Sequence, residues 1–305
     1  MATKINKKIL LESLKKKWIQ QNDVDKDVWI ENYPYYFKDL KRNLICNMSS
    51  TAKNEYAKGA GSEFKWTKRN GKYLPPKMQA IHSSSAMTFN IFGDDTIEIG
   101  NNNPIGLPAG KYKIDYERKL PTGVNSAKAN IDACLTSEIG EEKEIVFFEM
   151  KMTEWLIGNT KKLPEAYLRP KATHLLELSD WTKKFVSLHK TNYFDVVQII
   201  LHIWGIYNSV INGDFKEVKK ITLICGMWTI ENEEFFCRKS EDQYKKYKDI
   251  YTKTNDEFEE FHNSLGKIKN LFENKGIKFN VKKVTVKEII ECFGKSNEPY
   301  LKRYI

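Results

Sequence analysis

Apolar residues follow two periods along this 305-residue chain. Segments in which every second residue is apolar, or in which apolar residues run together between turn formers, predict strands. Segments in which apolar residues recur every three or four positions predict helices. The expected strands are 96–99, 112–118, 129–136, 144–152, 220–226 and 279–286, and the expected helices are 4–21, about 35–57, about 76–92 and 193–211, with a long amphipathic helix after residue 238 and short helices at the end.

The helix expected at 193–211 is apolar around its whole circumference, which indicates that it is buried. Asn212 and Gly213 follow it as a C-terminal cap. Gln198 and His202 are four positions apart in this helix and therefore lie on one face. Buried polar groups need partners, so this pair either serves a site or is a satisfied polar pair of the core.

Two of the expected strands form an antiparallel hairpin, 130–135 and 145–152, around a turn at 137–142. Side chains alternate across a strand, so Glu149 and Lys151 share one face. Asp132 in the neighbouring strand brings a second carboxylate to the same place. Charges in apolar strands are costly unless they are paired, bound to metal or directed into a cleft. The hairpin therefore predicts a metal site for phosphate chemistry. The alternative is an exposed hairpin in which Glu149 and Lys151 are ordinary surface residues.

The order of the elements predicts an α/β (α+β) fold. A helix precedes about three antiparallel strands, and a buried helix and one more strand follow them. We expect a helical N-terminal section at 1–57, a core at 58–230, and a mainly helical C-terminal section at 231–305 that packs on the core.

Composition narrows the classes of protein to consider. The net charge of +10 favours an acidic partner, with nucleic acid ahead of a membrane surface. The five cysteines are widely spaced in apolar runs, which is typical of a reduced cytoplasmic protein. We expect no signal peptide and no membrane span. Gly59 and Gly61 lack the third glycine and the preceding strand of a dinucleotide fingerprint, so no nucleotide cofactor is expected.

The order of elements and the residues Asp132, Glu149 and Lys151 resemble the PD-(D/E)xK nucleases of the restriction-endonuclease-like superfamily. Further segments resemble bacterial type II restriction endonucleases of that superfamily, and together these cover about residues 35–228. They are YAKGAGSE at 56–63, SSS at 83–85 with NIFG at 90–93, ANIDA at 129–133 and FEMKMTE at 148–154. Ile131 stands where the motif has proline, a departure that many members share.

The resemblance implies an αβββαβ core with a mixed sheet and a Mg²⁺-dependent endonuclease that cleaves double-stranded DNA, leaving 5′-phosphate and 3′-hydroxyl ends. Mn²⁺ can substitute in such enzymes. Asp132 and Glu149 would hold the metal, and Lys151 would position or deprotonate the attacking water. Gln198 would orient the lysine or the water. Cutting both strands favours a homodimer.

Further residues are candidates for the same site. Glu63 and Glu117 could supply another acid, and His202 another polar group, although each glutamate could also be a plain loop or strand residue. Lys161, Lys162, Arg169 and Lys171 lie in a basic segment after the hairpin that could contact phosphates or could be a solvated face.

Two other functions fit these features. A repair or mobile-element nuclease on the same core would act on a structured or damaged substrate in place of a short duplex sequence. A catalytically inactive DNA-binding module would have lost the geometry of Asp132, Glu149 and Lys151.

Overall fold

The computed structural model describes residues 3–22, 26–59, 62–93, 95–137, 143–158 and 161–305. The turn expected at 137–142 lies outside the described residues except for Ser137, as does Gly61. The strands are β1 (Trp29–Ile30), β2 (Tyr33–Phe37), β3 (Thr67–Arg69), β4 (Lys72–Leu74), β5 (Thr96–Ile99), β6 (Gly110–Pro121), β7 (Lys128–Ser137), β8 (Lys143–Lys151), β9 (Val218–Met227) and β10 (Lys278–Thr285). The α-helices are α1 (Lys7–Asn22), α2 (Ser50–Lys58), α3 (Ser84–Phe92), α4 (Glu154–Ile157), α5 (Leu176–Leu188), α6 (Val196–Ile211), α7 (Ser240–Asn263), α8 (Gly266–Glu273) and α9 (Val286–Cys292).

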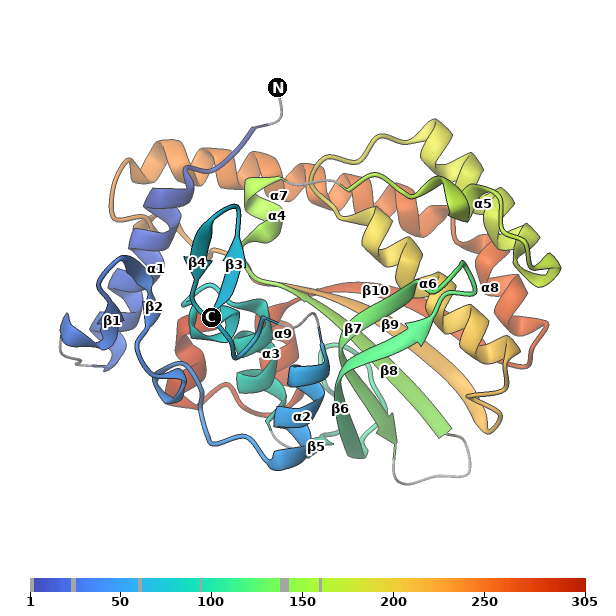
Figure 1. The fold of residues 1–305 in the computed structure, drawn as a ribbon, viewed down its shortest axis with the longest axis horizontal. Helices are drawn as coiled ribbons and strands as arrows, with labels where there is room; N and C mark the ends of the chain where they lie inside the picture. The colour runs from blue at the N-terminus through green and yellow to red at the C-terminus, as the bar shows by residue number, and fades with distance from the viewer. Residues whose placement is uncertain (1–2, 23–25, 60–61, 94, 138–142, 159–160) are drawn as a thin grey trace.

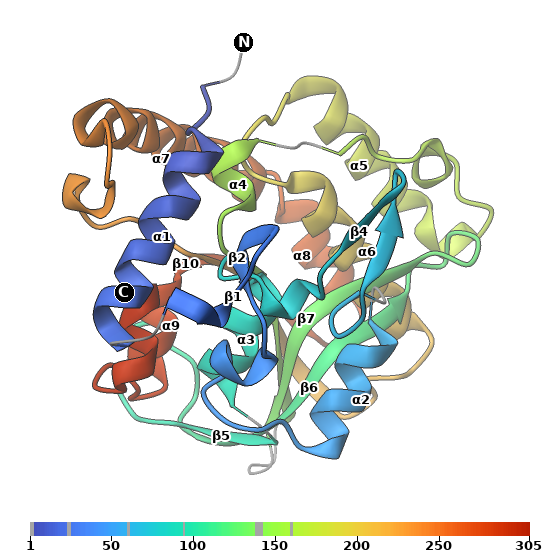
Figure 2. The same cartoon turned by 60° about the vertical axis from the view of Figure 1, so that its left-hand side comes forward.

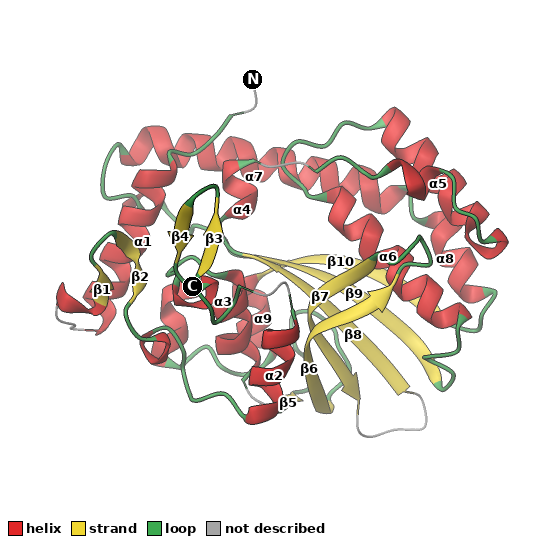
Figure 3. Cartoon of the chain, viewed as in Figure 1, coloured by secondary structure: helices red, strands yellow, loops and turns green. Residues whose placement is uncertain are grey.

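A mixed sheet forms the centre of the molecule (Figure 1, Figure 3). Within the described part of the chain, its strands follow the order β10-β9-β8-β7-β6-β5. Neighbours β5, β6, β7 and β8 are antiparallel, whereas β8, β9 and β10 run parallel to one another. β8 lies inside the sheet, and its residues from Glu144 to Met150 are all buried. This position explains why the strand is apolar on both faces.

Two apolar cores cover the two faces of the sheet. One contains residues of α1, α2, α3 and α9, and the other contains residues of α5, α6 and α8. Val146 and Phe148 of β8 belong to the first core, and Phe147 belongs to the second, as the alternation of a strand requires. Helix α7 joins both cores, because Tyr247 packs in the first and Phe261 in the second.

Helix α1 lies beside the C-terminal end of the chain (Figure 2). Helix α1 packs against the 3₁₀ helix Pro299–Tyr304, and Lys17 Nζ donates a hydrogen bond to the backbone oxygen of Ile305. The first and last segments therefore pack into the same apolar core, on one face of the sheet.

The structure confirms the six expected strands and the helices expected at 4–21 and 193–211. The expected mixed α/β fold is also observed, and from α3 to β9 the helices and strands follow the order α3, β5, β6, β7, β8, α4, α5, α6 and β9. The prediction of one helix over 35–57 is wrong. The aromatic run at 33–37 forms β2, which pairs with β1, and α2 begins only after its cap Ser49.

Two other helix boundaries differ from the expectation. The helix expected from about residue 76 begins at Ser84, because Ser83 is its N-cap and accepts from the backbone N–H of Ala86. The long helix after 238 is divided into α7 and α8 at Ser264 and Leu265. Among the described residues, the model contains no helix of the length and hydrophobicity that a membrane crossing requires.

Candidate active site

The hairpin of β7 and β8 opens at Asp132. The two strands pair from Thr136 and Ile145 as far as Ala133 and Phe148, where the ladder ends. Beyond that point an oxygen of the Asp132 carboxylate accepts a hydrogen bond from the backbone N–H of Met150 at 2.6 Å. The side chain thus replaces a ladder partner, and the opening between the strands places a carboxylate beside the end of β8.

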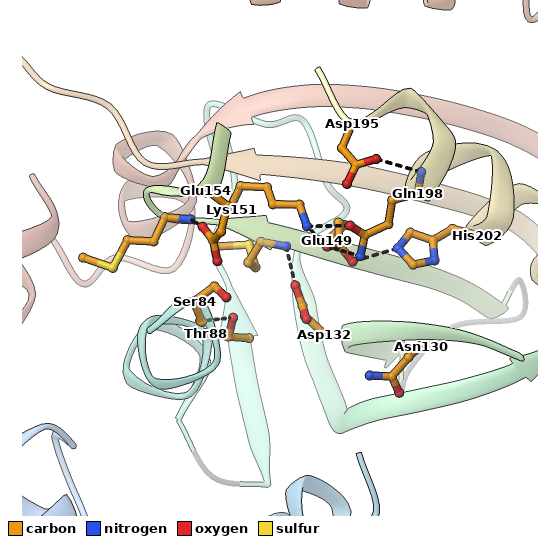
Figure 4. Close-up of polar contacts among 12 residues, drawn as sticks. Ser84, Thr88, Asn130, Asp132, Glu149, Lys151, Glu154, Asp195, Gln198 and His202 are labelled. Atoms are coloured by element: carbon orange, nitrogen blue, oxygen red, sulfur yellow. Dashed lines mark hydrogen bonds and ion pairs between the residues drawn. The ribbon is translucent and has the colours of Figure 1, made fainter. Parts of the chain in front are cut away.

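Glu149 occupies the centre of the site, with an exposed fraction of 1%. Its Oε1 lies 2.6 Å from Lys151 Nζ and 2.7 Å from Gln198 Nε2, and its Oε2 lies 2.7 Å from His202 Nε2 (Figure 4). Burial alone would raise the pKa of this carboxyl, but the charges and hydrogen bonds of Lys151 and His202 lower it to about 2. Glu149 is therefore an anion at neutral pH.

Lys151 is held by two partners at the same place. Its Nζ donates to Gln198 Oε1 at 2.6 Å as well as pairing with Glu149. Burial lowers the pKa of Lys151, but Glu149, Glu154 and Asp132 together raise it above the usual value for lysine. The side chain is therefore an ammonium at neutral pH, and it acts as a hydrogen-bond donor and a positive charge.

Helix α6 brings Gln198 and His202 to Glu149. Asp195 caps this helix, since its Oδ1 accepts from the backbone N–H of Gln198 at 3.1 Å. The four-residue spacing places both polar side chains on the face that meets β8. The helix approaches the sheet closely at Gly205, where a Cβ atom would lie 2.8 Å from the Cβ of Ala129.

Glu63 and Glu117 form an acidic group next to these residues. Asn130 Nδ2 donates to Glu117 Oε2, and Lys77 Nζ lies 3.2 Å from Glu63 Oε1. Burial raises the pKa of Glu117 to about 7, and the charges of Glu63 and Glu149 act in the same direction. Sequence reasoning did not identify the contact of Asn130, although this residue directly precedes Ile131 and Asp132 in the expected strand.

The donor set of Asp132 and Glu149 suits a divalent cation such as Mg²⁺, which prefers oxygen ligands. Burial and the charges of Glu149 and Glu117 raise the pKa of Asp132 well above its ordinary value, so a cation at this place would favour its ionised form. Within the described ranges, no group of three or more His, Cys, Asp or Glu side chains is placed to hold a metal ion. A Mg²⁺ ion held by these two carboxylates would take further ligands from water or phosphate oxygens, as is common for this ion.

A cavity of about 180 Å³ adjoins Lys151 and Gln198. Trp155, Tyr193 and Phe194 form much of its apolar wall, and Lys161 also lines it. Sequence reasoning missed Tyr193, Phe194 and Asp195 as lining residues, although they directly precede the apolar helix that carries Gln198. Lys161, Lys162, Arg169 and Lys171 are all exposed, and the last three do not line this cavity.

Comparison with protein families gives one match relevant to this site. The model of a family described as restriction endonuclease associating with ARP matches residues 13–291, which include every residue of the site. Searches of curated proteins and of solved structures gave no match. Because the family match extends over most of the sequence, the chain belongs to the family of restriction endonucleases associating with ARP.

Proposed function

We propose that this protein is a Mg²⁺-dependent type II restriction endonuclease with a PD-(D/E)xK site, which hydrolyses phosphodiester bonds of double-stranded DNA to 5′-phosphate and 3′-hydroxyl ends. The observation that carries the proposal is the arrangement of Lys151, Glu149 and Gln198 beside Asp132, in a chain of a restriction endonuclease family. We propose that α3, β6, β7, β8, α6 and β9 form the αβββαβ core of such a nuclease, with β5, α4 and α5 as additions to it, and their order along the chain supports the same assignment.

Asp132 and Glu149 would hold the metal, which supplies neutralisation of phosphoryl charge and lowers the pKa of a bound water. Mn²⁺ would serve in the same place. Lys151, as an ammonium, orients the attacking water by hydrogen bonding and opposes the negative charge that develops on the phosphoryl group. Its raised pKa favours positioning of the water over deprotonation of the water by the lysine.

Gln198 and His202 position the reacting groups. Gln198 contacts both Lys151 and Glu149, so it fixes the distance between the ammonium and the carboxylate. His202 donates to the other oxygen of Glu149 and prevents rotation of that carboxylate. We propose Glu63 and Glu117 as further acids of the site. Lys161, Lys162, Arg169 and Lys171 remain candidates for phosphate contacts, and two copies of the chain would cut the two strands.

The test is digestion of mixed-sequence plasmid DNA with Mg²⁺ by the wild type and by Lys151→Ala. We expect discrete fragments from the wild type and at least a hundredfold slower cleavage by the variant, since loss of a transition-state donor costs about 10²–10³ in rate. Lys143→Ala is the matched control, because Lys143 lies at the other end of β8, is exposed and pairs with Glu217. Equal cleavage by Lys151→Ala and the wild type would contradict the role of Lys151.

A further inference from the structure

The short hairpin of β3 and β4 is a second feature with chemistry suited to DNA. Its turn, Asn70-Gly71, has positive φ at both residues, 50° and 78°, which is the signature of a tight two-residue hairpin. The hairpin forms a two-stranded sheet of its own and is not part of the central sheet (Figure 1). The pairing of Lys68 with Tyr73 places these two side chains on one face, and Trp66 shares that face by alternation.

That face is aromatic and basic, and it is open to solvent. Trp66 is 49% exposed and Tyr73 is 61% exposed, which makes them two of the four exposed large hydrophobic side chains in the described part of the chain. Lys68 is exposed on this face, and Lys65 and Lys72 are exposed on the opposite face of the hairpin. No acidic side chain among the described residues forms an ion pair with these three lysines. The sequence contains no Asp or Glu between Phe64 and Gly93. The hairpin therefore carries a cluster of positively charged side chains without acidic residues between them.

The base of the hairpin is attached to the acidic group of the site. Lys77 N donates to Ser62 O at 2.9 Å, and Met78 N donates to Glu63 O at 3.2 Å, so the two legs are joined where they leave the core. Lys77 Nζ also pairs with Glu63, which is only 3% exposed. Tyr33 of β2 supports the β3–β4 hairpin, because its ring contacts Trp66 and its hydroxyl donates to Tyr73 O. A ligand bound by the hairpin would thus lie next to the candidate active site.

We propose that the β3–β4 hairpin enters the major groove of duplex DNA and is the main element by which this protein holds and reads its substrate. A two-stranded ribbon has the width that the major groove accepts. The lysines neutralise phosphates on either side of the groove, and the exposed face with Lys68 and Tyr73 is directed at the base edges. This inference rests on the proposed function for the choice of DNA as the ligand.

The test measures binding without cleavage. The fluorescence anisotropy of a labelled mixed-sequence duplex, several helical turns long, is followed in EDTA at a series of salt concentrations. Lys68→Ala/Lys72→Ala is compared with the wild type and with Lys267→Ala/Lys275→Ala. The control removes the same charge from exposed positions at α8, which packs on β10 at the far edge of the sheet. We expect the hairpin variant to bind at least tenfold more weakly and its salt slope to fall by about 1 for each lysine that contacts phosphate. The control should bind like the wild type.

A second measurement tests which groove is used. A pool of duplexes lightly methylated at guanine N7, an atom of the major groove, is separated into bound and free fractions. Wild-type protein should leave methylated guanines enriched in the free fraction, and the hairpin variant should lose this discrimination. Equal methylation of both fractions with the wild type would overturn the insertion into the major groove.

The outcomes separate this inference from the nuclease proposal, since EDTA removes the metal that cleavage requires. If the wild type binds the duplex in EDTA but cuts nothing with Mg²⁺, the nuclease proposal fails and the hairpin assignment stands. If the hairpin variant keeps the wild-type affinity and salt slope, or the α8 control loses as much affinity as the hairpin variant, the hairpin assignment fails whatever the cleavage result. A wild-type protein without affinity for duplex DNA would overturn both.

Discussion

Glu149 shows how a single buried charge can be kept without large cost. Each of its oxygens has partners, and two of these, Lys151 and Gln198, also contact each other. A fully satisfied polar group of this kind fixes side-chain positions, whereas loss of any one partner would leave a buried charge unpaired. The arrangement explains why a glutamate can lie inside a strand whose residues from Glu144 to Met150 are all buried.

The environment of Glu117 favours the protonated carboxyl, whereas that of Glu149 favours the carboxylate. Its pKa is raised from the ordinary value of 4.5 to about 7, first by burial and then by neighbouring carboxylates. Between these values the folded protein binds a proton that the unfolded chain has released. The free energy of unfolding therefore falls as the pH rises from about 4.5 to about 7, by on the order of 3 kcal/mol in total.

Glu117→Gln should remove this dependence, since a glutamine carries no charge and its side-chain oxygen can still accept from Asn130. We expect a higher melting temperature than the wild type at pH 8 in EDTA and no difference near pH 4.5. Thermal unfolding across this range checks it, with the exposed Glu98→Gln on β5 as the control. A wild type and a Glu117→Gln variant that melt with the same pH profile would show that Glu117 ionises without penalty.

Among the elements, the six strands of the central sheet could be predicted from the sequence because their apolar alternation and flanking turns are local signals, whereas the short strands β1 to β4 were not predicted. Residues 35–37 fall in the helix expected at about 35–57, although Tyr35-Tyr36-Phe37 has the aromatic character of a strand and belongs to β2. Helix α5 was missed, although Leu178, Trp181, Thr182 and Phe185 keep helical spacing and are buried. The polar and charged residues between these positions made the helical periodicity hard to recognise.

The contacts of the candidate site could be predicted only in part. The spacing of Gln198 and His202, and the alternation of Glu149 and Lys151, placed each pair on a common face. That the two faces meet depends on the packing of α6 against β7 and β8, which no local pattern encodes. The positive φ of Glu117, 49°, is likewise set by the irregular pairing of β6 with β7, where Glu117 and Asp132 are skipped.

Gly205 is the position where α6 comes nearest to the sheet, so it controls how Gln198 and His202 reach Glu149. A Cβ atom there would lie 3.0 Å from the Cβ of Leu120 as well as 2.8 Å from that of Ala129. Gly205→Ala should therefore push the helix outward. We expect a loss of about 1–3 kcal/mol from overpacking, partly offset by about 1 kcal/mol of helix propensity.

Thermal unfolding and DNA cleavage measured together check the Gly205 prediction, since the shift of α6 should lower both. Gly266→Ala in α8 is the matched control, because a Cβ atom at Gly266 meets nothing within 4 Å. We expect that control to melt at or above the wild-type temperature. An active Gly205→Ala protein with wild-type stability would mean that the sheet yields to the extra methyl group.

At the scale of the whole molecule, the C-terminal section completes both the sheet and the second core. β10 pairs with β9 along eight residues, from Lys278 with Lys220 to Thr285 with Met227. Phe261, Leu265, Ile268 and Phe272 are fully buried in the core that contains α6. Burial of each such side chain contributes about 1.5–3 kcal/mol to the free energy of unfolding, and the net free energy of unfolding of a domain is only about 5–15 kcal/mol.

A chain that ends at residue 230 should therefore not fold by itself, even though it contains every candidate residue of the site. Without residues 231–305 the edge of β9 is unpaired, and the helix that carries Gln198 loses its cover. We expect the fragment to show no cooperative thermal transition by circular dichroism and to cleave no DNA. Coexpression with the fragment 231–305 is the control, because the same contacts can form between two chains and should restore a cooperative transition. A fragment 1–230 that melts cooperatively would instead make the C-terminal section a separable addition to the nuclease core.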